Sequence, residues 1–373
     1  PVLFCHRMRD EICLKDTHDD DEFTEYLCCG GLVGSLEASG SIRRIGRPMV
    51  ETFAGTWTEV LARAQVFGSA ARARALLRQS SFGLLACMNE VMWSTYVDPY
   101  AVFSQVGPEL RFLSVAELED SIEKVSPQDA RAVMREIAGR YEVLKNVDEE
   151  KFLASVRASM GMERLAEERG VDLLVLNDID RVVFEHIGLR PGFWPTSPRV
   201  RTHIVPEGDI GGGIACFVLK LLAGGHVNYI EPFHIDLPNR CFAAGHAGPN
   251  DYTDPRGKCK VSSDVRFAKT KWKYAGAPFA WYVFPSGEKT MLHCSSQTGK
   301  FQLVASRVEA LPTEHFLATY SHSLFRPVGQ ECGELFSRLL RQGVTQHYGI
   351  ADGNVIPAVR DLAMMLNLEF EEI

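Results

Sequence analysis

Apolar residues recur along the chain with two different spacings, and the pattern changes near residue 231. Between residues 56 and 230, short apolar runs alternate with longer segments in which apolar residues recur every three or four positions. The runs are typical of strands buried on both faces, and the longer segments are typical of amphipathic helices. After residue 231, short strands alternate with turns that contain glycine, and the helical spacing is rare before Gly329. The chain therefore predicts two parts that are built differently.

The clearest predicted elements lie in the first part. Residues 56–79 and 148–169 predict long helices, because their apolar positions follow the helical period. Residues 81–88 and 171–178 predict buried strands. Near the start of the chain, the acidic run Asp16–Phe23 predicts a solvated loop, since runs of charge usually lie in water.

These elements define the predicted fold class, which is α/β. Strands alternating with helices predict a doubly wound, Rossmann-like parallel sheet, and we assign it to residues 1–230. Short strands joined by hairpin-sized turns predict an antiparallel, barrel-like domain over residues 231–373. The last segment predicts a strand, a turn and a terminal helix that is apolar on one face.

Composition narrows the class of protein. A chain of 373 residues has room for two domains, and 40 basic against 48 acidic residues give a net charge of -8. Such a charge favours neither nucleic acid nor an anionic membrane as a partner. No apolar run approaches the roughly 20 residues that cross a bilayer. The ten cysteines are scattered without a C-x-x-C pair or a secretory signal, so we expect reduced thiols in a cytoplasmic protein.

One stretch, residues 204–248, gathers most of the candidate functional residues. Glu207 ends a β-rich lead-in and is followed by a glycine, where the backbone can turn sharply. The apolar run Ile210–Leu222 predicts a buried helix closed by glycines. The next extended segment carries Glu231, and His246 follows after a short hairpin. Two carboxylates and an imidazole thus end consecutive elements, where α/β folds bind their ligands.

His347 is a further candidate, because it lies just before Gly349 and a helix start, at a turn where side chains point into a cleft. Ordinary explanations remain: Glu207 could cap a helix, and the histidines could be surface or core residues. Along the chain, 24, 15 and 101 residues separate successive candidates, so they form no local motif. Carboxylates with one or two imidazoles suit Mn²⁺ or Mg²⁺. Such an ion can polarise a carbonyl group and stabilise an ene-diolate, which is the chemistry of aldose–ketose isomerisation.

The sequence around these candidates resembles the L-fucose/L-arabinose isomerase superfamily. The resemblance rests on Val205–Gly224, on the extended segment with Glu231, and on Thr345–Leu368. In L-fucose isomerases a Glu, a second acidic residue and a His before a Gly hold Mn²⁺. The resemblance implies that Glu207, Glu231 and His347 hold this ion here, with Mg²⁺ or Co²⁺ as possible substitutes. Glu231 stands where fucose isomerases have Asp.

Two further roles come from the same resemblance. The arabinose-type branch has a fourth ligand, a His in a G-x-H segment after a hairpin, and His246 is similar to it. His246 is therefore expected to be a fourth ligand or a substrate contact. Gln346 falls where the family has a polar residue that faces the sugar hydroxyl groups.

The resemblance implies an intramolecular oxidoreductase, an aldose–ketose isomerase acting on a linear sugar. Glu207 and Glu231 would move a proton between C1 and C2 through an ene-diol. A homo-oligomer, trimer or hexamer, is also implied. Family members usually carry an additional N-terminal α/β domain, and by resemblance this chain begins near the start of the second domain. An alternative remains open: a non-catalytic or repurposed sugar-binding relative of the same fold.

Overall fold

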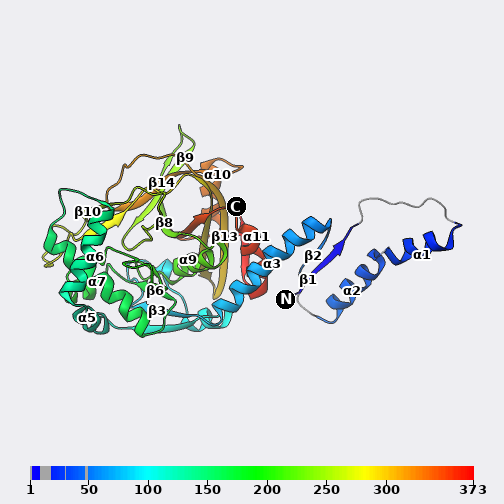
Figure 1. The fold of residues 1–373 in the computed structure, drawn as a ribbon, viewed down its shortest axis with the longest axis horizontal. Helices are drawn as coiled ribbons and strands as arrows, with labels where there is room; N and C mark the ends of the chain where they lie inside the picture. The colour runs from blue at the N-terminus through cyan, green and yellow to red at the C-terminus, as the bar shows by residue number, and fades with distance from the viewer. Residues whose placement is uncertain (1, 9–17, 30, 47–48) are drawn as a thin grey trace.

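The computed structural model describes residues 2–8, 18–29, 31–46 and 49–373. A main body contains the parallel sheet and a barrel, and the N-terminal elements extend from one side of it (Figure 1). No helix in these described ranges is both long and apolar enough to cross a membrane. The α/β fold class with a barrel-like second part is confirmed, whereas the predicted division into residues 1–230 and 231–373 stays a prediction.

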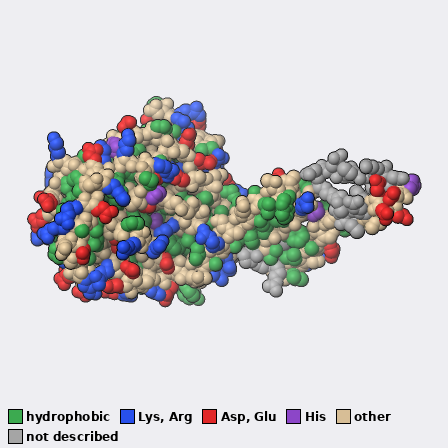
Figure 2. Space-filling model, viewed as in Figure 1, with side chains coloured by type: hydrophobic (Ala, Val, Ile, Leu, Met, Phe, Trp, Pro, Cys, Tyr) green, Lys and Arg blue, Asp and Glu red, His purple; other side chains and the backbone are tan. Residues whose placement is uncertain are grey.

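The N-terminal extension is a small β-α-α-β unit. Strands β1 (Val2–Arg7) and β2 (Met49–Gly55) pair in parallel, and helices α1 (Asp20–Cys29) and α2 (Leu32–Arg44) lie between them in the chain. No residue of α2 is buried. Hydrophobic side chains are accordingly exposed on this extension (Figure 2).

The prediction of a solvated loop over Asp16–Phe23 is wrong for its second half. Asp20, Asp21 and Glu22 form the first turn of α1. Acidic side chains are favourable there, because the N-terminal end of a helix carries a partial positive charge. The acidic run is thus a helix start, while residues 16 and 17 lie outside the described residues.

The parallel sheet has four strands. They are ordered β4 (Glu109–Leu113), β3 (Ser81–Leu85), β6 (Leu173–Leu176) and β7 (His203–Val205), and each pair is parallel. All residues of β3 and β6 are buried, as their continuous apolar runs predict. The strand order reverses beside β3, so the chain winds outward in both directions from that strand, as the doubly wound prediction requires.

Helices cover both faces of this sheet because successive strand residues point to opposite sides. Leu174 and Leu176 share a core with α5 and α7. Leu173 and Val175 share another core with α3 and α9. The bounds of the helices are α3 (Trp57–Leu77), α5 (Val115–Glu123), α6 (Pro127–Arg140), α7 (Glu149–Glu168), α8 (Arg181–His186) and α9 (Ile210–Ala223).

The second part is a six-stranded antiparallel barrel. It closes because β12 pairs with β13 as well as with β15. In spatial order the strands are β12 (Gly287–Gln297), β15 (Tyr348–Asp352), β8 (Val227–Asp236), β9 (Cys241–Ala247), β14 (Tyr320–Pro327) and β13 (Lys300–Ala310). Strand β16 (Glu369–Glu372) adds to β13 in parallel. Nearby lie α10 (Cys332–Arg341), α11 (Ile356–Leu366) and a small sheet of β5 (Glu142–Val143), β10 (Lys260–Ser263) and β11 (Pro278–Trp281).

Helix α9 is wedged between the parallel sheet and the barrel. A Cβ atom added at Gly211 would lie 2.4 Å from the Cys294 carbonyl oxygen of β12. At Gly213 it would lie 3.0 Å from a methyl group of Val175 in β6. Real Cβ contacts are rarely this short, so the glycines of the first turn let both layers approach the helix closely. Helix α9 therefore contacts β6 and β7 on one side and β8, β12 and β15 on the other.

A buried carboxyl group joins α7 to the segment after α8. Glu163 is 8% exposed and accepts hydrogen bonds from the backbone N–H of Thr196, at 2.7 Å, and from the Thr196 hydroxyl group. Burial raises the pKa of Glu163 to about 7 because it outweighs those hydrogen bonds, which favour the ionised form. The ordinary value is 4.5, so the folded protein holds this proton more tightly than the unfolded chain does.

We expect the stability that Glu163 contributes to be complete below pH 4.5 and to be lost as the pH rises through about 7. The loss amounts to about 3 kcal/mol of unfolding free energy. Glu163→Gln has no proton to lose and should gain stability relative to the unchanged protein across that range. Urea unfolding at a series of pH values measures the difference. Glu168→Gln, exposed on the same helix, is the control, and equal pH slopes for Glu163→Gln and the unchanged protein would contradict the prediction.

Candidate metal centre

Glu207 is delivered by the tight connection between β7 and α9. Its φ of 67° lies in the left-handed region, which is unfavourable for a residue with a side chain, and Gly208 follows at 68°. Two side chains hold the strained peptide groups in place. Asp178 accepts a hydrogen bond from the Glu207 N–H at 3.0 Å, and Asn89 donates one to the Glu207 carbonyl oxygen at 3.1 Å. These partners come from the loops after β6 and β3, at the carboxyl edge of the sheet.

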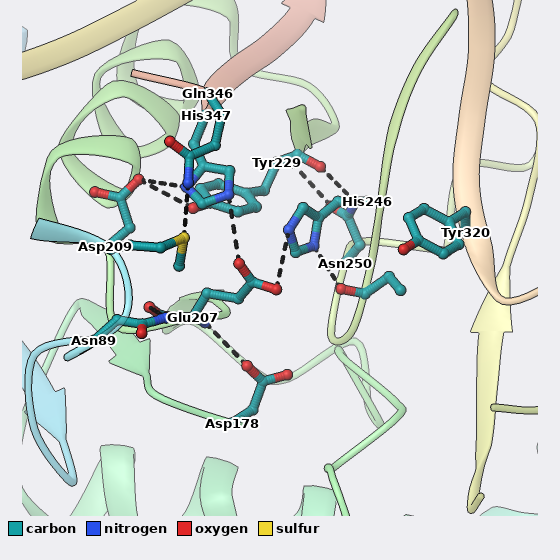
Figure 3. A network of polar contacts seen from close by, with 12 residues as sticks. Asn89, Asp178, Glu207, Asp209, Tyr229, His246, Asn250, Tyr320, Gln346 and His347 are labelled. Carbon is teal, nitrogen blue, oxygen red and sulfur yellow. Dashed lines mark hydrogen bonds and ion pairs between the residues drawn. The ribbon is translucent and has the colours of Figure 1, made fainter. Parts of the chain in front are cut away.

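The carboxylate of Glu207 lies between two imidazole rings (Figure 3). Its two oxygens lie 3.5 Å from His246 Nε2 and 3.5 Å from His347 Nε2. One ligand atom from each of the three residues falls within 4.8 Å of the others. His246 is carried by β9 and His347 directly precedes β15, so the parallel part and the barrel both contribute to the group.

The outer nitrogen of each ring fixes how the inner nitrogen can act. His347 Nδ1 lies 3.0 Å from Asp209 Oδ2, and His246 Nδ1 contacts the carbonyl oxygen of Ala247. Both oxygens only accept, so each Nδ1 carries a proton. The lone pair of each neutral ring is then on Nε2, which is buried and lacks a hydrogen-bond partner among the described residues. Two lone pairs and a carboxylate facing one point are what a metal cation requires.

The charge of His347 supports the same conclusion. Burial disfavours a charged imidazole, but Asp209 and Glu207 outweigh it and raise the pKa of His347 to about 9. A proton on Nε2 is therefore favoured between the ring and Glu207 when nothing else is bound there. A divalent cation would compete for that same position, because metal ligands must be deprotonated to bind.

Asp209 connects three parts of the fold through one buried carboxylate. Asp209 Oδ1 caps α9 by accepting a hydrogen bond from the Gly212 N–H at 3.0 Å. Asp209 Oδ2 accepts hydrogen bonds from the Tyr229 hydroxyl group and from His347 Nδ1, each at 3.0 Å. Burial alone would raise its pKa, but the contacts with His347 and Gly212 lower it, so Asp209 is ionised. A carboxylate behind a histidine orients the ring and makes it a stronger ligand.

The buried charges around the centre do not balance. Although burial opposes ionisation, the two imidazoles and Arg190 hold the pKa of Glu207 well below its ordinary value. Arg190 lies 2.6 Å from Asp178 and 3.9 Å from both Glu207 and Asp264. Four carboxylates and two guanidinium groups belong to this network of contacts, which leaves two negative charges when the imidazoles are neutral; the set is Asp178, Glu207, Asp209 and Asp264 with Arg190 and Arg266. Uncompensated buried charge is costly, and a divalent cation would remove it.

His293 holds the segment that delivers His347. Its Nδ1 donates to the His347 carbonyl oxygen at 2.8 Å, and its Nε2 accepts the Thr345 N–H at 3.3 Å. Both ring nitrogens are therefore committed to backbone, and burial lowers the pKa of His293, which keeps the ring neutral. No local sequence pattern indicates this role, because a histidine within an apolar strand resembles any core residue.

Gln346 points toward the loop that follows β3. Its side-chain nitrogen lies 2.7 Å from the sulfur of Met92, and Gln346 is next in the chain to the fully buried His347 (Figure 3). The neighbouring Trp93 is 82% exposed in the short helix η1 (Trp93–Thr95). Gln346 therefore lies beside the centre, and its contact with sugar hydroxyl groups stays a prediction.

Glu231 is not part of the three-residue group. It is half-buried on β8, opposite Gly245 of β9. Because side chains alternate along a strand, Glu231 lies on the same face of β8 as Tyr229, and its partner across the ladder is Gly245 rather than His246. The side chain of Asn250 accepts a hydrogen bond from the Tyr229 N–H and donates one to the Tyr229 carbonyl oxygen. The Tyr229 ring packs against both histidines. The role of Glu231 as a ligand stays a prediction.

Comparison with known proteins gives partial matches. No protein-family model matches the chain. It is 26% identical over 165 residues, 44% of its length, to sulfoquinovose isomerases of Priestia aryabhattai and Priestia megaterium. It is 23% identical over 170 residues, 45% of its length, to that of Alkalicoccus urumqiensis. The matches span only 35% to 36% of those relatives. The chain thus has distant, partial homology to sugar isomerases.

We expect Asp209→Asn to weaken metal binding about 10-fold to 100-fold, because it removes the negative charge behind His347. Asn caps a helix about as well as Asp, so α9 should keep its first turn. Isothermal titration with Mn²⁺ and Co²⁺ measures the affinity. Asp148→Asn, at the N-terminal cap of α7, is the matched control. An unchanged affinity in Asp209→Asn would show that Asp209 does not support the ligand.

Proposed function

We propose that this chain carries the metal centre of an aldose–ketose isomerase of the L-fucose/L-arabinose isomerase type, acting on a linear sugar. The observation that carries the proposal is the convergence of Glu207, His246 and His347. The Nε2 atoms of both rings have no hydrogen-bond partner in the described part of the chain and face one carboxylate. The distant homology to sugar isomerases supports the same reaction class. The family resemblance also supports a cytoplasmic homo-oligomer, a trimer or hexamer.

Mn²⁺ is the proposed ion, with Co²⁺ or Mg²⁺ as substitutes. Glu207 supplies an oxygen, and His246 and His347 supply nitrogens. Imidazole suits first-row transition ions, whereas Mg²⁺ prefers oxygen ligands and retains water. We therefore rank Mg²⁺ below the other two ions for this donor set.

Aldose–ketose conversion moves two protons and changes which carbon bears the carbonyl group. A base removes the proton from C2; the C–H electron pair forms the C1–C2 double bond, and the carbonyl pair moves to O1. The proton returns to C1, and the hydroxyl proton of O2 ends on O1, which leaves a carbonyl group at C2. A bound divalent ion would supply electrostatic stabilisation of the charge that develops on oxygen.

The residues of this chain would bind the sugar and carry the proton. We propose Glu207 and Glu231 as the carboxylates that move it between C1 and C2. Glu207 is held ionised and fixed in direction by its two imidazole neighbours. Glu231 is half-buried on the adjacent strand β8. Gln346 and His246 would contact the hydroxyl groups.

We expect Glu207→Gln to lower Mn²⁺ affinity at least about 100-fold and to abolish ketose formation, because an amide is a poor ligand and a poor base. Titration calorimetry and a ketose assay measure the two effects. Glu185→Gln, an exposed residue of α8, is the control. Isomerase activity retained in Glu207→Gln would count against the mechanism. An unchanged protein that binds Mn²⁺ and sugar without making ketose would favour the sugar-binding alternative.

Glu231→Gln separates two roles for that residue. If Glu231 moves the proton, the rate of ketose formation should fall about 100-fold or more while Mn²⁺ affinity stays within a few-fold. Exchange of the sugar C2 proton with deuterated water, followed by nuclear magnetic resonance, should fall in parallel. Loss of Mn²⁺ binding would instead assign Glu231 as a fourth ligand, and full activity would remove it from the site.

A further inference from the structure

We propose that Arg266 binds an acidic group at the far end of the sugar, so that the substrate is an aldose with a sulfonate or phosphate group remote from its carbonyl. The inference rests on the proposed isomerase function and specifies its substrate class. It places an anion site beside the metal centre, on the segment between β10 and β11.

The segment that carries Arg266 is strongly basic. Residues 265–275 contain Arg266, Lys269, Lys271 and Lys273 without an acidic residue, in a chain whose net charge is -8. The three lysines are exposed. A local excess of positive charge attracts anions and raises their concentration near the surface.

A continuous chain of polar contacts joins this segment to the metal centre. The guanidinium group of Arg190 lies 3.9 Å from the carboxylate of Glu207. The Arg190 group lies 3.9 Å from Asp264, and Asp264 lies 3.1 Å from Arg266. Arg266 is thus three polar contacts from the carboxylate that faces both imidazoles.

Arg266 is held in a fixed orientation with one edge available. Asp264 accepts hydrogen bonds from the Arg266 backbone N–H at 3.0 Å, from Nε at 3.1 Å and from Nη2 at 3.1 Å. The remaining nitrogen, Nη1, makes a long contact of 3.4 Å to the Tyr320 hydroxyl group. The side chain is 29% exposed. A planar guanidinium group fixed in this way suits the paired oxygens of a sulfonate or phosphate.

Tyr320 relates Arg266 to the imidazole side of the centre. The Arg266 guanidinium lies over the Tyr320 ring, 5.2 Å from its centroid. Tyr320 pairs with Ala247, the residue after His246, and Figure 3 shows Tyr320 on the His246 side of the site. Tyr320 therefore lies on β14 beside the strand that carries His246, and its hydroxyl group and ring contact Arg266.

Arg190 is closer to Glu207 but is unsuited to bind substrate. It is 2% exposed, and Asp178 lies 2.6 Å from it. The rings of Phe267 and Phe279 flank its guanidinium group at 5.7 Å and 5.6 Å. Arg190 therefore balances buried carboxylates, and Arg266 is the guanidinium group of this chain of contacts that solvent and a ligand can reach.

The first experiment compares three aldoses with the unchanged, Mn²⁺-loaded protein. Sulfoquinovose and glucose 6-phosphate carry an acidic group at C6, and quinovose, which is 6-deoxyglucose, lacks one. We expect kcat/KM for at least one acidic sugar to exceed that for quinovose by about tenfold or more. Equal values would overturn the anion site while leaving the isomerase function intact. The better of the two acidic sugars identifies sulfonate or phosphate.

The second experiment tests the residue. Arg266→Gln should raise KM for the preferred acidic sugar about tenfold or more and lower its selectivity over quinovose by a similar factor. Arg266→Lys keeps the charge but loses the planar fork, and should recover only part of the selectivity. Lys273→Gln is the control, because Lys273 faces Glu150 at 3.8 Å and should leave the selectivity unchanged.

Two outcomes separate failure of this inference from failure of the proposed function. If Arg266→Gln keeps the full selectivity, Arg266 is not the anion site. If the unchanged protein isomerises none of the three sugars, the proposed function fails. Calorimetry then compares the affinity for sulfoquinovose of the unchanged protein with that of Arg266→Gln, and equal affinities would overturn the anion site at Arg266. Mn²⁺ affinity of Arg266→Gln, measured in parallel, shows that the variant is folded around its centre.

Discussion

The buried carboxylate of Asp209 is the interaction on which the arrangement of the centre depends. An isolated charge in the interior is very unfavourable, so Asp209 must keep its hydrogen-bond donors. Those donors belong to α9, to Tyr229 on β8 and to His347 before β15. The hydrogen bonds to this one carboxylate therefore link the parallel part to the barrel in one relative position. The orientation of the His347 ring follows from that requirement.

Close packing of α9 makes this contact possible. Gly212 illustrates the constraint, because a Cβ atom there would lie 2.5 Å from both Asp209 Oδ2 and the Tyr229 ring. Glycine costs helix stability in the interior of a helix, so its use in the first turn of α9 reflects the space required there. The run of three glycines thus allows the carboxylate of Asp209 and the phenol group of Tyr229 to lie close to the first turn of α9.

Much of the fold could be predicted from the sequence, because strands buried on both faces and amphipathic helices leave clear patterns. Glu207, His246 and His347 could also be singled out, since each ends an element next to glycine. The placement of Glu231 could not, because the pattern of β8 does not reveal where pairing with β9 stops. Asp209 resembles an ordinary helix cap in the sequence, and it is one. Its second oxygen accepts hydrogen bonds from Tyr229 and His347, which lie far along the chain, so no local pattern could predict these contacts.

The two parts of the fold supply different components of the centre. Carboxylates come from the edge of the parallel sheet, at Asp178, Glu207 and Asp209, and the imidazoles come from barrel strands or their ends. In the three-residue group, the parallel part supplies the carboxylate of Glu207 and the barrel supplies both imidazoles. Arg266 lies outside this shared edge and is linked to it through Asp264 and Arg190, whereas Tyr320 lies on β14 next to the strand that carries His246. In the proposed function, a change at Arg266 would alter the substrate preference and leave Glu207, His246 and His347 in place.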